Sequence, residues 1–210
     1  MIALRRIFEE PLRSLLINMS HWAAIFLLAF GQIQSVSAQS NHYLQLFSEK
    51  PEFVSDGFDF PVGPPDSKGY YNAQGFGKNN HLGDDWNGTG GGNSDLGDPI
   101  YIIANGYVVS TEHHGPGWGN VIRVIHYIKG KDQFIESLYA HCQKMEVKTG
   151  DWIKRGQKIG TIGNAEGTYW AHLHLEIRSE VDMDLGGGYS TETEGFLDPT
   201  AFIKSNRPKN

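Results

Sequence analysis

The sequence predicts a mainly β domain that is rich in turns. Glycine is frequent, with 26 residues in a chain of 210, and short apolar runs alternate with clusters of Gly, Asn and Asp. This is the pattern of short strands joined by tight turns. Hydrophobic residues make up 39% of the chain, which is enough for a packed core. The length fits one domain of ordinary size behind a removable leader.

Residues 1–38 have the organisation of a signal peptide. Three arginines precede the apolar run 22–30 (WAAIFLLAF), and residues 36–38 (VSA) supply the small side chains of a cleavage site. The apolar run is shorter than the ~20 residues that a membrane-spanning helix needs. We therefore expect export and cleavage after Ala38 rather than an anchor. Met19 is an alternative start, although it would remove every arginine from the leader.

The rest of the chain divides into a lead-in and a folded domain. Residues 39–76 are expected to form an irregular lead-in with one strand, because 58–77 is rich in Pro, Gly and aromatic residues. The domain is expected over 77–205. Asp198 and Pro199 fit the N-cap and first turn of a short terminal helix. Strands are predicted at 99–104, 106–111, 120–127, 134–141, 158–162 and 171–178.

The last predicted strand, 171–178 (AHLHLEIR), alternates strictly between apolar and polar residues. Such a strand has one apolar face in the core and one polar face, which we expect to line a solvent-filled groove. His172 and His174 then point the same way, so their imidazoles can converge on one site. Alone, a His-x-His pair is more often a pair of exposed polar positions.

A second polar cluster, His81-Leu82-Gly83-Asp84-Asp85, places a His and a carboxylate within reach of one ion. Catalytic zinc sites use three His or carboxylate ligands and leave a fourth position for water. His81, a carboxylate and one imidazole of the 172/174 pair supply such a set, and the other imidazole can act on the water. On composition alone, Asp84 competes with Asp85.

His141 ends the predicted strand 134–141 and offers another base near the water. Its neighbour Cys142 should point into the core, which argues against a cysteine nucleophile. Cys142 is the single cysteine, so neither a disulfide within the chain nor a Cys-based zinc site can form. The remaining histidines of the domain, His113, His114 and His126, are expected at the surface.

The net charge of −6 excludes the basic face that a nucleic-acid-binding protein needs to neutralise phosphates.

Three motifs in order, His-x-x-x-Asp at 81–85, Tyr-Ala-His at 139–141 and His-Leu-His at 172–174, resemble the lysostaphin/LytM-type zinc metalloendopeptidases of peptidoglycan. The resemblance runs from about residue 77 to 203, including the glycine-punctuated stretch 147–160 and Phe-Leu-Asp-Pro at 196–199. The loop 86–95 (WNGTGGGNSD) is longer and richer in glycine than the family pattern.

The resemblance implies that His81, Asp85 and His174 hold one Zn²⁺, and that His141 and His172 orient and deprotonate a water molecule. It implies an antiparallel β-sheet half-barrel (the biotinyl/lipoyl-hybrid type) with an open groove. The implied activity is hydrolysis of peptide bonds in peptidoglycan stem peptides or cross-links, by a monomer at the cell wall, periplasmic or extracellular. After signal cleavage we expect no membrane span.

Other functions compete with this interpretation. A non-catalytic relative that binds the wall or regulates an amidase would lack metal or base residues, and all five are present. A phosphocarrier-like domain with a biotinyl-type hairpin leaves His81 and Asp85 unexplained. Another zinc hydrolase, such as a wall carboxypeptidase, lacks the Tyr-x-His strand. Residues 39–77 could also cover the groove as a latent plug, with Asn72 or Asn79 on the metal.

Overall fold

The computed structural model describes residues 41–208. The described residues divide into two units at residue 50, with 41–49 in the first and 50–208 in the second. In the first unit the described residues 41–49 are helical, and the predicted signal peptide lies outside the described residues. Residues 50–76 belong to the same compact unit as the residues that follow them. Within the described part, no helix is both long enough and apolar enough to cross a membrane.

The second unit is built on one large antiparallel sheet and one small one. The large sheet has the order β1-β2-β10-β6-β5-β4-β8, with β11 paired to β10, and the small sheet has the order β3-β9-β7. The strands are β1 (Tyr70–Gln74), β2 (Asp84–Gly88), β3 (Pro99–Tyr101), β4 (Gly106–His113), β5 (Asn120–Ile128), β6 (Gln133–Cys142), β7 (Lys144–Met145), β8 (Trp152–Ile153), β9 (Lys158–Thr161), β10 (Leu173–Arg178) and β11 (Phe196–Leu197).

Short helical elements complete this unit. The α-helix α2 spans Pro199–Ser205 near the end of this unit. Asp198 caps it, because its side chain accepts a hydrogen bond from the Ala201 N–H at 2.9 Å. The 3₁₀ turns are η1 (Pro51–Phe53), η2 (Lys78–Asn80), η3 (Lys129–Lys131) and η4 (Ala165–Gly167).

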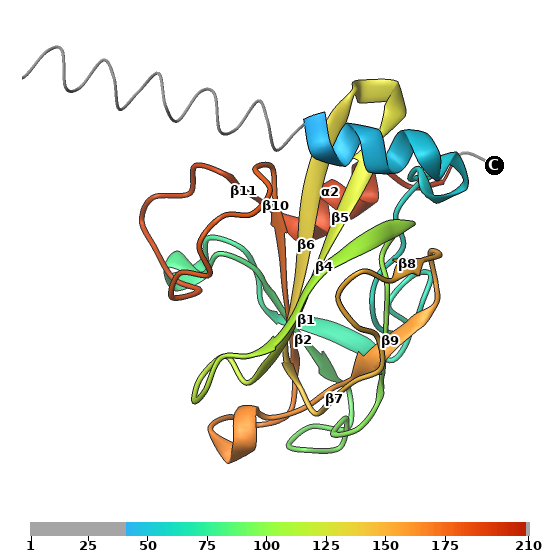
Figure 1. The fold of residues 1–210 in the computed structure, drawn as a ribbon. Helices are drawn as coiled ribbons and strands as arrows, with labels where there is room; N and C mark the ends of the chain where they lie inside the picture. Colours follow the sequence, from blue (N-terminus) through green and yellow to red (C-terminus); the bar gives the residue numbers. More distant parts are fainter. Residues whose placement is uncertain (1–40, 209–210) are drawn as a thin grey trace, which may run out of the picture. The chain divides into compact units, whose positions relative to one another are not determined.

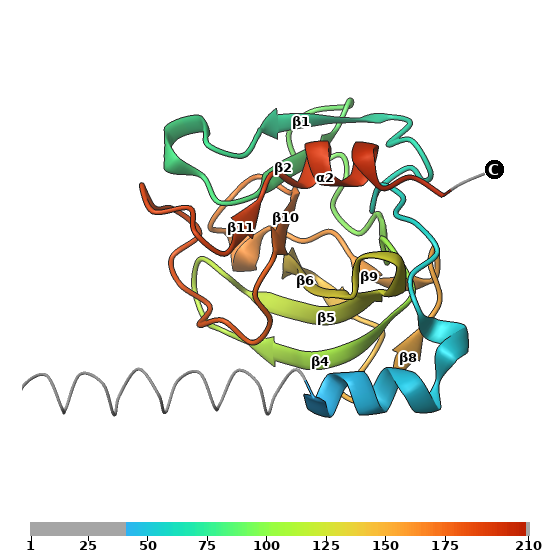
Figure 2. The ribbon, with the colours of Figure 1, turned by 90° about the horizontal axis from the view of Figure 1, so that it is seen from above.

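The large sheet is open and curved. Figure 1 shows β4, β5, β6 and β10 side by side, and Figure 2 shows the sheet bending from β4 around β6 and β10 toward β1, without closing. The predicted mainly β, antiparallel fold with an open sheet is therefore confirmed. All six predicted strands are present, although β3, β9 and β10 are shorter than predicted.

The core lies against the concave sheet and between the two sheets. Phe58, Phe60 and Val62 of the predicted lead-in are buried in it, so the irregular part of this segment supplies apolar surface. The one strand expected in the lead-in is β1. Cys142 is also buried there, as its place next to His141 predicted, and burial raises the pKa of its thiol to about 12. The thiol therefore stays protonated at neutral pH.

Strand β10 differs from its predicted environment, because both of its faces are buried. The apolar face packs in the core, but Glu176 and Arg178 on the other face are fully buried as well. The segment between β10 and β11 covers them through the carbonyl groups of residues 183–185. The polar face of the strand thus lines a groove at its N-terminal end and a buried ion-pair network at its C-terminal end.

His126 was predicted at the surface, and this prediction was wrong. The side chain is fully buried, with Nδ1 2.9 Å from the Asn105 carbonyl oxygen and Nε2 2.7 Å from Ser137 Oγ. Both ring nitrogens therefore have partners, which offsets the cost of burying the imidazole.

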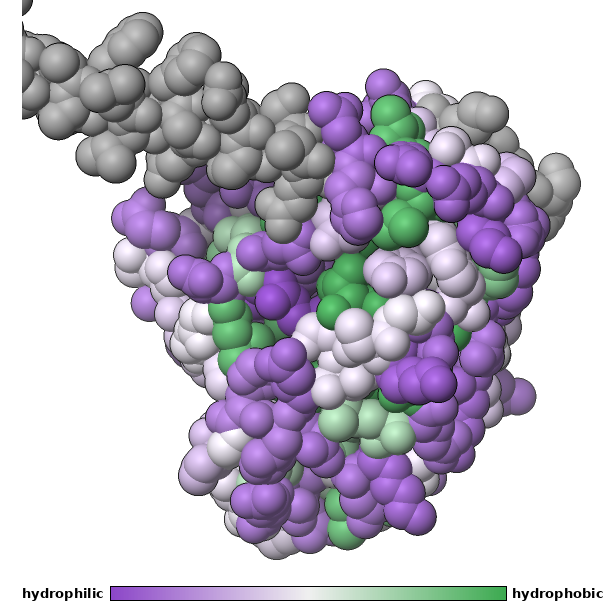
Figure 3. Space-filling model, viewed as in Figure 1, coloured by the Kyte–Doolittle hydropathy of each residue, from purple (hydrophilic) through white to green (hydrophobic). Residues whose placement is uncertain are grey.

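The face seen in Figure 3 is mostly hydrophilic outside the grey atoms, with hydrophobic residues in small separate patches. Trp170 is the most exposed of the large hydrophobic side chains of this unit, at 70%.

Candidate metal and catalytic site

Sheet topology brings the five predicted site residues together. Asp85 lies on β2, His174 on β10 and His141 at the end of β6, and these three strands are adjacent in the sheet. His174 is in register with Asp85 on one side and with Ala140 on the other. His81 precedes β2, where it forms an isolated β-bridge with Tyr189.

Three donor atoms form a tight triangle. His81 Nε2 lies 3.0 Å from His174 Nδ1 and 3.3 Å from Asp85 Oδ1, and His174 Nδ1 lies 3.0 Å from Asp85 Oδ1. A tetrahedral zinc ion with bonds of ~2.0–2.1 Å separates neighbouring ligand atoms by about 3.3 Å. Two imidazoles and a carboxylate are also a ligand set of catalytic zinc sites, so these residues fit a zinc ion.

The neighbouring carboxylate of Glu176 assigns the tautomer of His174. Glu176 Oε1 lies 3.1 Å from His174 Nε2. A carboxylate accepts hydrogen bonds, so Nε2 carries a proton and donates this hydrogen bond. The lone pair of the neutral ring is then on Nδ1, toward the triangle. A metal-ligating His commonly donates its other N–H to a carboxylate, which fixes the ring and raises its basicity.

Electrostatics favours a cation at this place. Burial alone would raise the pKa of Asp85, but hydrogen bonds with His174 and His81 outweigh it, and the pKa lies well below its usual range. Burial alone would lower the pKa of His174, but hydrogen bonds to Asp85 and Glu176 raise it to about 9. The two carboxylates thus stabilise positive charge between them, whether a proton or a metal ion supplies it.

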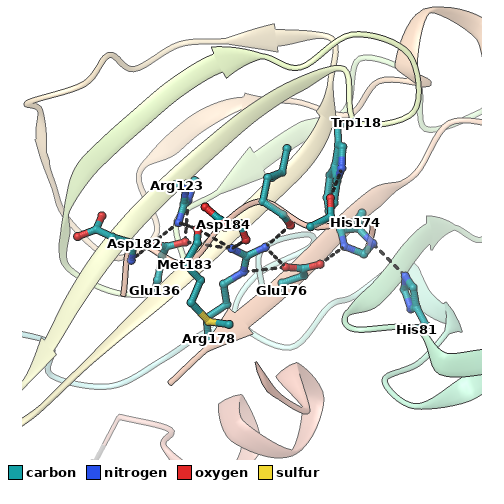
Figure 4. A network of polar contacts seen from close by, with 12 residues as sticks. His81, Trp118, Arg123, Glu136, His174, Glu176, Arg178, Asp182, Met183 and Asp184 are labelled. Carbon is teal, nitrogen blue, oxygen red and sulfur yellow. Dashed lines mark hydrogen bonds and ion pairs between the residues drawn. The ribbon is translucent and has the colours of Figure 1, made fainter. Parts of the chain in front are cut away.

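Behind Glu176 lies a buried ion-pair network, drawn in Figure 4. Glu176 accepts hydrogen bonds from the Arg178 guanidinium, and Arg123 donates to Glu136 in the same network. Burial would raise the pKa of Glu176, but His174 and Arg178 outweigh it and lower that pKa. The metal triangle is therefore backed by charged groups with fixed partners.

His141 and His172 occupy the other side of the site in matching orientations. His172 Nδ1 lies 2.8 Å from the Trp170 carbonyl oxygen, and His141 Nδ1 lies 3.2 Å from that of Trp118. Because a carbonyl oxygen can only accept, each ring carries its proton on Nδ1 and keeps a lone pair on Nε2. The two rings lie 4.7 Å apart.

The backbone and the surroundings of His141 are unusual. Its φ is +59°, in the left-handed region that non-glycine residues rarely adopt. Residues held in such conformations cluster at functional sites. Burial, followed by the positive potential of His172 and His174, lowers the pKa of His141 to about 3. The ring is neutral at pH 7, as a proton acceptor must be.

These groups meet in a pocket of about 380 Å³. Its aromatic lining includes Tyr169, whose ring lies 5.2 Å from that of His141, and Tyr189, whose ring lies 5.0 Å from that of His81. Burial and the Asp85 carboxylate raise the pKa of Tyr189, so its hydroxyl keeps a proton to donate. The described residues of the lining are Gln74, His81, Asp85, Pro116, Gly117, Trp118, His141, Tyr169, His172, His174, Gly187, Gly188 and Tyr189.

A second pocket of about 560 Å³ continues from His172 and Tyr169 toward Trp170. It includes Asn87 of β2 and Asn93 of the glycine-rich loop that follows, because residues 86–88 of the expected loop 86–95 belong to the strand. This loop therefore shapes a groove beside the candidate catalytic histidines.

The two neighbouring aspartates point to different places. Asp85 faces the histidines, whereas Asp84 accepts hydrogen bonds from Thr200 Oγ1 at 2.6 Å and from the Phe76 N–H at 3.1 Å. Alternation along β2 separates them. Asn72 and Asn79, the two candidates for a plug, are absent from the described lining of the pocket, to which the lead-in contributes Gln74.

Residue patterns alone missed several members of the site. Glu176 follows His174 by two residues and so shares its face of β10, a signal that was available in the sequence. Trp118, Tyr169 and Tyr189 come from loops, and nothing in their spacing connects them with the histidines.

Comparisons with known proteins agree with this geometry. The model of Peptidase family M23 matches residues 85–185. The chain is 42% identical over 82 residues to the lipoprotein NlpD of Yersinia enterocolitica, a match covering 39% of this chain and 78% of that protein. It is 35% identical over 82 residues to the peptidoglycan DD-endopeptidase ShyA of Vibrio cholerae, covering 39% of this chain and 18% of ShyA.

Lysostaphin is similar in both sequence and structure. The chain is 31% identical over 110 residues to lysostaphin of Staphylococcus simulans, covering 52% of this chain and 20% of that protein. The solved structure of lysostaphin matches with a TM-score of 0.50 and 27% identity, covering 65% of this chain and 50% of that one. The matches thus span most of NlpD but only about a fifth of ShyA and lysostaphin. The chain belongs to peptidase family M23, the family of the lysostaphin and LytM-type proteins.

Proposed function

We propose that this chain is a zinc-dependent endopeptidase that hydrolyses peptide bonds in the stem peptides or cross-links of peptidoglycan. The observation that carries the proposal is the division of one pocket into two halves. One half holds the triangle of His81, Asp85 and His174 donor atoms. The other holds two imidazoles that keep their Nε2 lone pairs, with His172 Nε2 3.7 Å from Asp85 Oδ1.

The proposed chemistry follows from these positions. A bound zinc ion would lower the pKa of a water ligand to ~7 and polarise the scissile carbonyl. His141 and His172 would accept the proton of the attacking water at Nε2 and later hold it for the leaving amine. Their Nδ1–H bonds to backbone carbonyls would keep both rings aimed at the pocket. A well-placed base adds about 10²–10⁴-fold to the rate.

A second candidate is a non-catalytic activator of another wall hydrolase. It is favoured by the similarity to NlpD proteins, since the chain is 40% identical over 82 residues to the murein hydrolase activator NlpD of Salmonella dublin. Against it stands the complete set of five pocket residues, because an activator needs neither a metal nor a base.

The location follows from the same proposal. A peptidoglycan hydrolase works outside the inner membrane, so we infer that residues 1–38 are removed as a signal peptide. The mature protein would act at the cell wall, in the periplasm or outside the cell. We further propose a monomer that binds one zinc ion through residues 77–205.

Metal analysis combined with digestion of purified peptidoglycan tests the proposal. We expect stoichiometric zinc and released muropeptides for the wild type, neither for His174→Ala, and zinc without turnover for His141→Ala. His113→Ala is the matched control, because this side chain is exposed and outside the pocket. A zinc-loaded wild type that releases nothing from any wall type would favour the activator instead.

A further inference from the structure

We propose that Arg178 is a positioning residue that holds both a metal ligand and the wall of the catalytic pocket. The inference rests on the proposed zinc site. The pocket wall is defined here as residues 182–189, the segment that ends in Gly187, Gly188 and Tyr189 of the pocket lining. Arg178 itself lies outside the lining and is fully buried.

The first contact of Arg178 leads to the metal ligand. Its Nε and Nη2 donate to Glu176 Oε2 at 2.9 and 2.6 Å. The other oxygen of the same carboxylate accepts from His174 Nε2 at 3.1 Å. The guanidinium therefore fixes the carboxylate, and the carboxylate fixes the imidazole whose Nδ1 faces the triangle (Figure 4).

The second set of contacts leads to the pocket wall. Arg178 Nη1 donates to the Asp184 carbonyl oxygen at 3.1 Å, and Nη2 donates to that of Leu185 at 2.9 Å. Beyond these carbonyls, Gly186 O accepts from Trp118 Nε1 at 3.1 Å, and Gly188 O accepts from the Leu82 N–H at 3.0 Å. One side chain thus supports the pocket from two directions.

The charges of the network balance, which allows it to be buried. Charge balance does not explain why charged residues occupy this place instead of apolar ones. Two arginines, Arg123 and Arg178, face two carboxylates, Glu136 and Glu176, and the Arg178 and Glu136 side chains approach to 4.0 Å. Well-packed apolar residues of similar volume often give equal or higher stability than a buried ion network. The ion network supplies hydrogen bonds that apolar residues cannot make. These bonds orient the His174 imidazole and hold the carbonyl groups of residues 183–185.

Replacing Arg178 with lysine separates the effect of the side chain's shape from that of its charge. Lysine keeps the positive charge but lacks the planar set of five N–H donors that serves Glu176 and the wall together. We expect Arg178→Lys to weaken zinc affinity about 10- to 100-fold, the range found when groups behind metal ligands are changed. Affinity is measured by competition with a chromophoric chelator, and hydrogen exchange over 182–189 is followed in the metal-free protein, where it should become faster.

Arg155→Lys is the matched control. Arg155 also bonds two carboxylates, Asp56 and Asp59, but it is not part of the pocket lining. We expect its zinc affinity and its exchange over 182–189 to match the wild type. If Arg178→Lys does not fold, Glu176→Gln replaces it, because an amide NH₂ cannot accept from Arg178 while the amide oxygen can still accept from His174.

Folded variants with wild-type zinc affinity and wild-type exchange over 182–189 would overturn the proposal. The proposal would also fail if Arg178→Lys and Arg155→Lys lost zinc affinity to the same extent, since the loss would then reflect a general effect on stability. A wild type that binds no zinc would instead refute the proposed function, and unchanged exchange over 182–189 would then decide separately against Arg178 as a support of the pocket wall.

Discussion

At the scale of single residues, Asp84 and Asp85 show how alternation along a strand assigns different tasks to identical side chains. The sequence left them equivalent except for the His-x-x-x-Asp spacing of the family. In the structure Asp85 faces His81 and His174, whereas Asp84 faces Thr200 on the other side of β2.

The pair allows a matched experiment. We expect Asp85→Asn to lose zinc at concentrations that saturate the wild type, because a neutral amide replaces the anionic ligand. Asp84→Asn should keep its zinc and lose about 1–2 kcal/mol of stability through its buried hydrogen bonds. Metal content after dialysis and urea unfolding measure the two effects. Zinc loss in Asp84→Asn alone would reverse the proposed ligand assignment.

His126 shows a residue role that the sequence could not reveal, because alternation alone does not tell which loops cover a strand. Burial lowers its pKa from 6.5 to about 4, against the opposing hydrogen bond to Asn105. The unfolded chain therefore binds a proton more readily than the folded one. This contribution to stability is complete above pH 6.5 and is lost as the pH falls toward 4.

We expect acidification from pH 7 to 4.5 to destabilise the wild type more than His126→Gln. The linkage amounts to roughly 3 kcal/mol over the whole window. The measurement is the free energy of unfolding by urea at several pH values. Other titrating groups, His141 included, are common to both proteins and cancel in the difference. Parallel curves for the two proteins would contradict the assigned pKa of His126.

At the scale of elements, strands with an alternating or apolar sequence could be predicted. Strands whose sequence has no such pattern, and that form only because neighbouring strands pair with them, could not. Strand β2 (DDWNG) carries no β pattern, yet it forms because β1 and β10 flank it. The same pairing brings Asp85 to His174. The C-terminal half of β10 was misjudged for a related reason, since residues 183–185 that cover it come from a loop without a recognisable pattern.

The contact between β10 and the segment before β2 depends on Gly83. A Cβ added there would lie 2.4 Å from the Leu175 carbonyl oxygen and 3.0 Å from a His174 ring carbon. We expect Gly83→Ala to push His81 and Asp85 away from β10 and to weaken zinc affinity at least about tenfold. Gly130→Ala is the control, because its Cβ would meet nothing within 4 Å. Unchanged zinc affinity in folded Gly83→Ala would show that the triangle does not need this close approach.

At the scale of the whole molecule, the proposed zinc ion joins parts of the chain that are distant in sequence. The metal triangle connects the segment at 81–85 with β10, which otherwise pair through three registered residues. Ligand binding to the folded state alone stabilises by RT ln(1 + [L]/Kd), which is about 2.7 kcal/mol at a zinc concentration of 100 Kd.

We therefore expect a chelator to lower the Tm of the wild type by about 5–10 °C, since 1 kcal/mol shifts Tm by ~2–4 °C in domains of this size. The Tm should rise with the logarithm of free zinc, and Asp85→Asn should respond to neither chelator nor zinc. Calorimetry at fixed pH measures this directly. The Arg155→Lys protein should start from a lower Tm yet show the full zinc response, because its ion pairs lie outside the pocket. A Tm independent of zinc in the wild type would mean that the triangle of His81, Asp85 and His174 does not bind the metal.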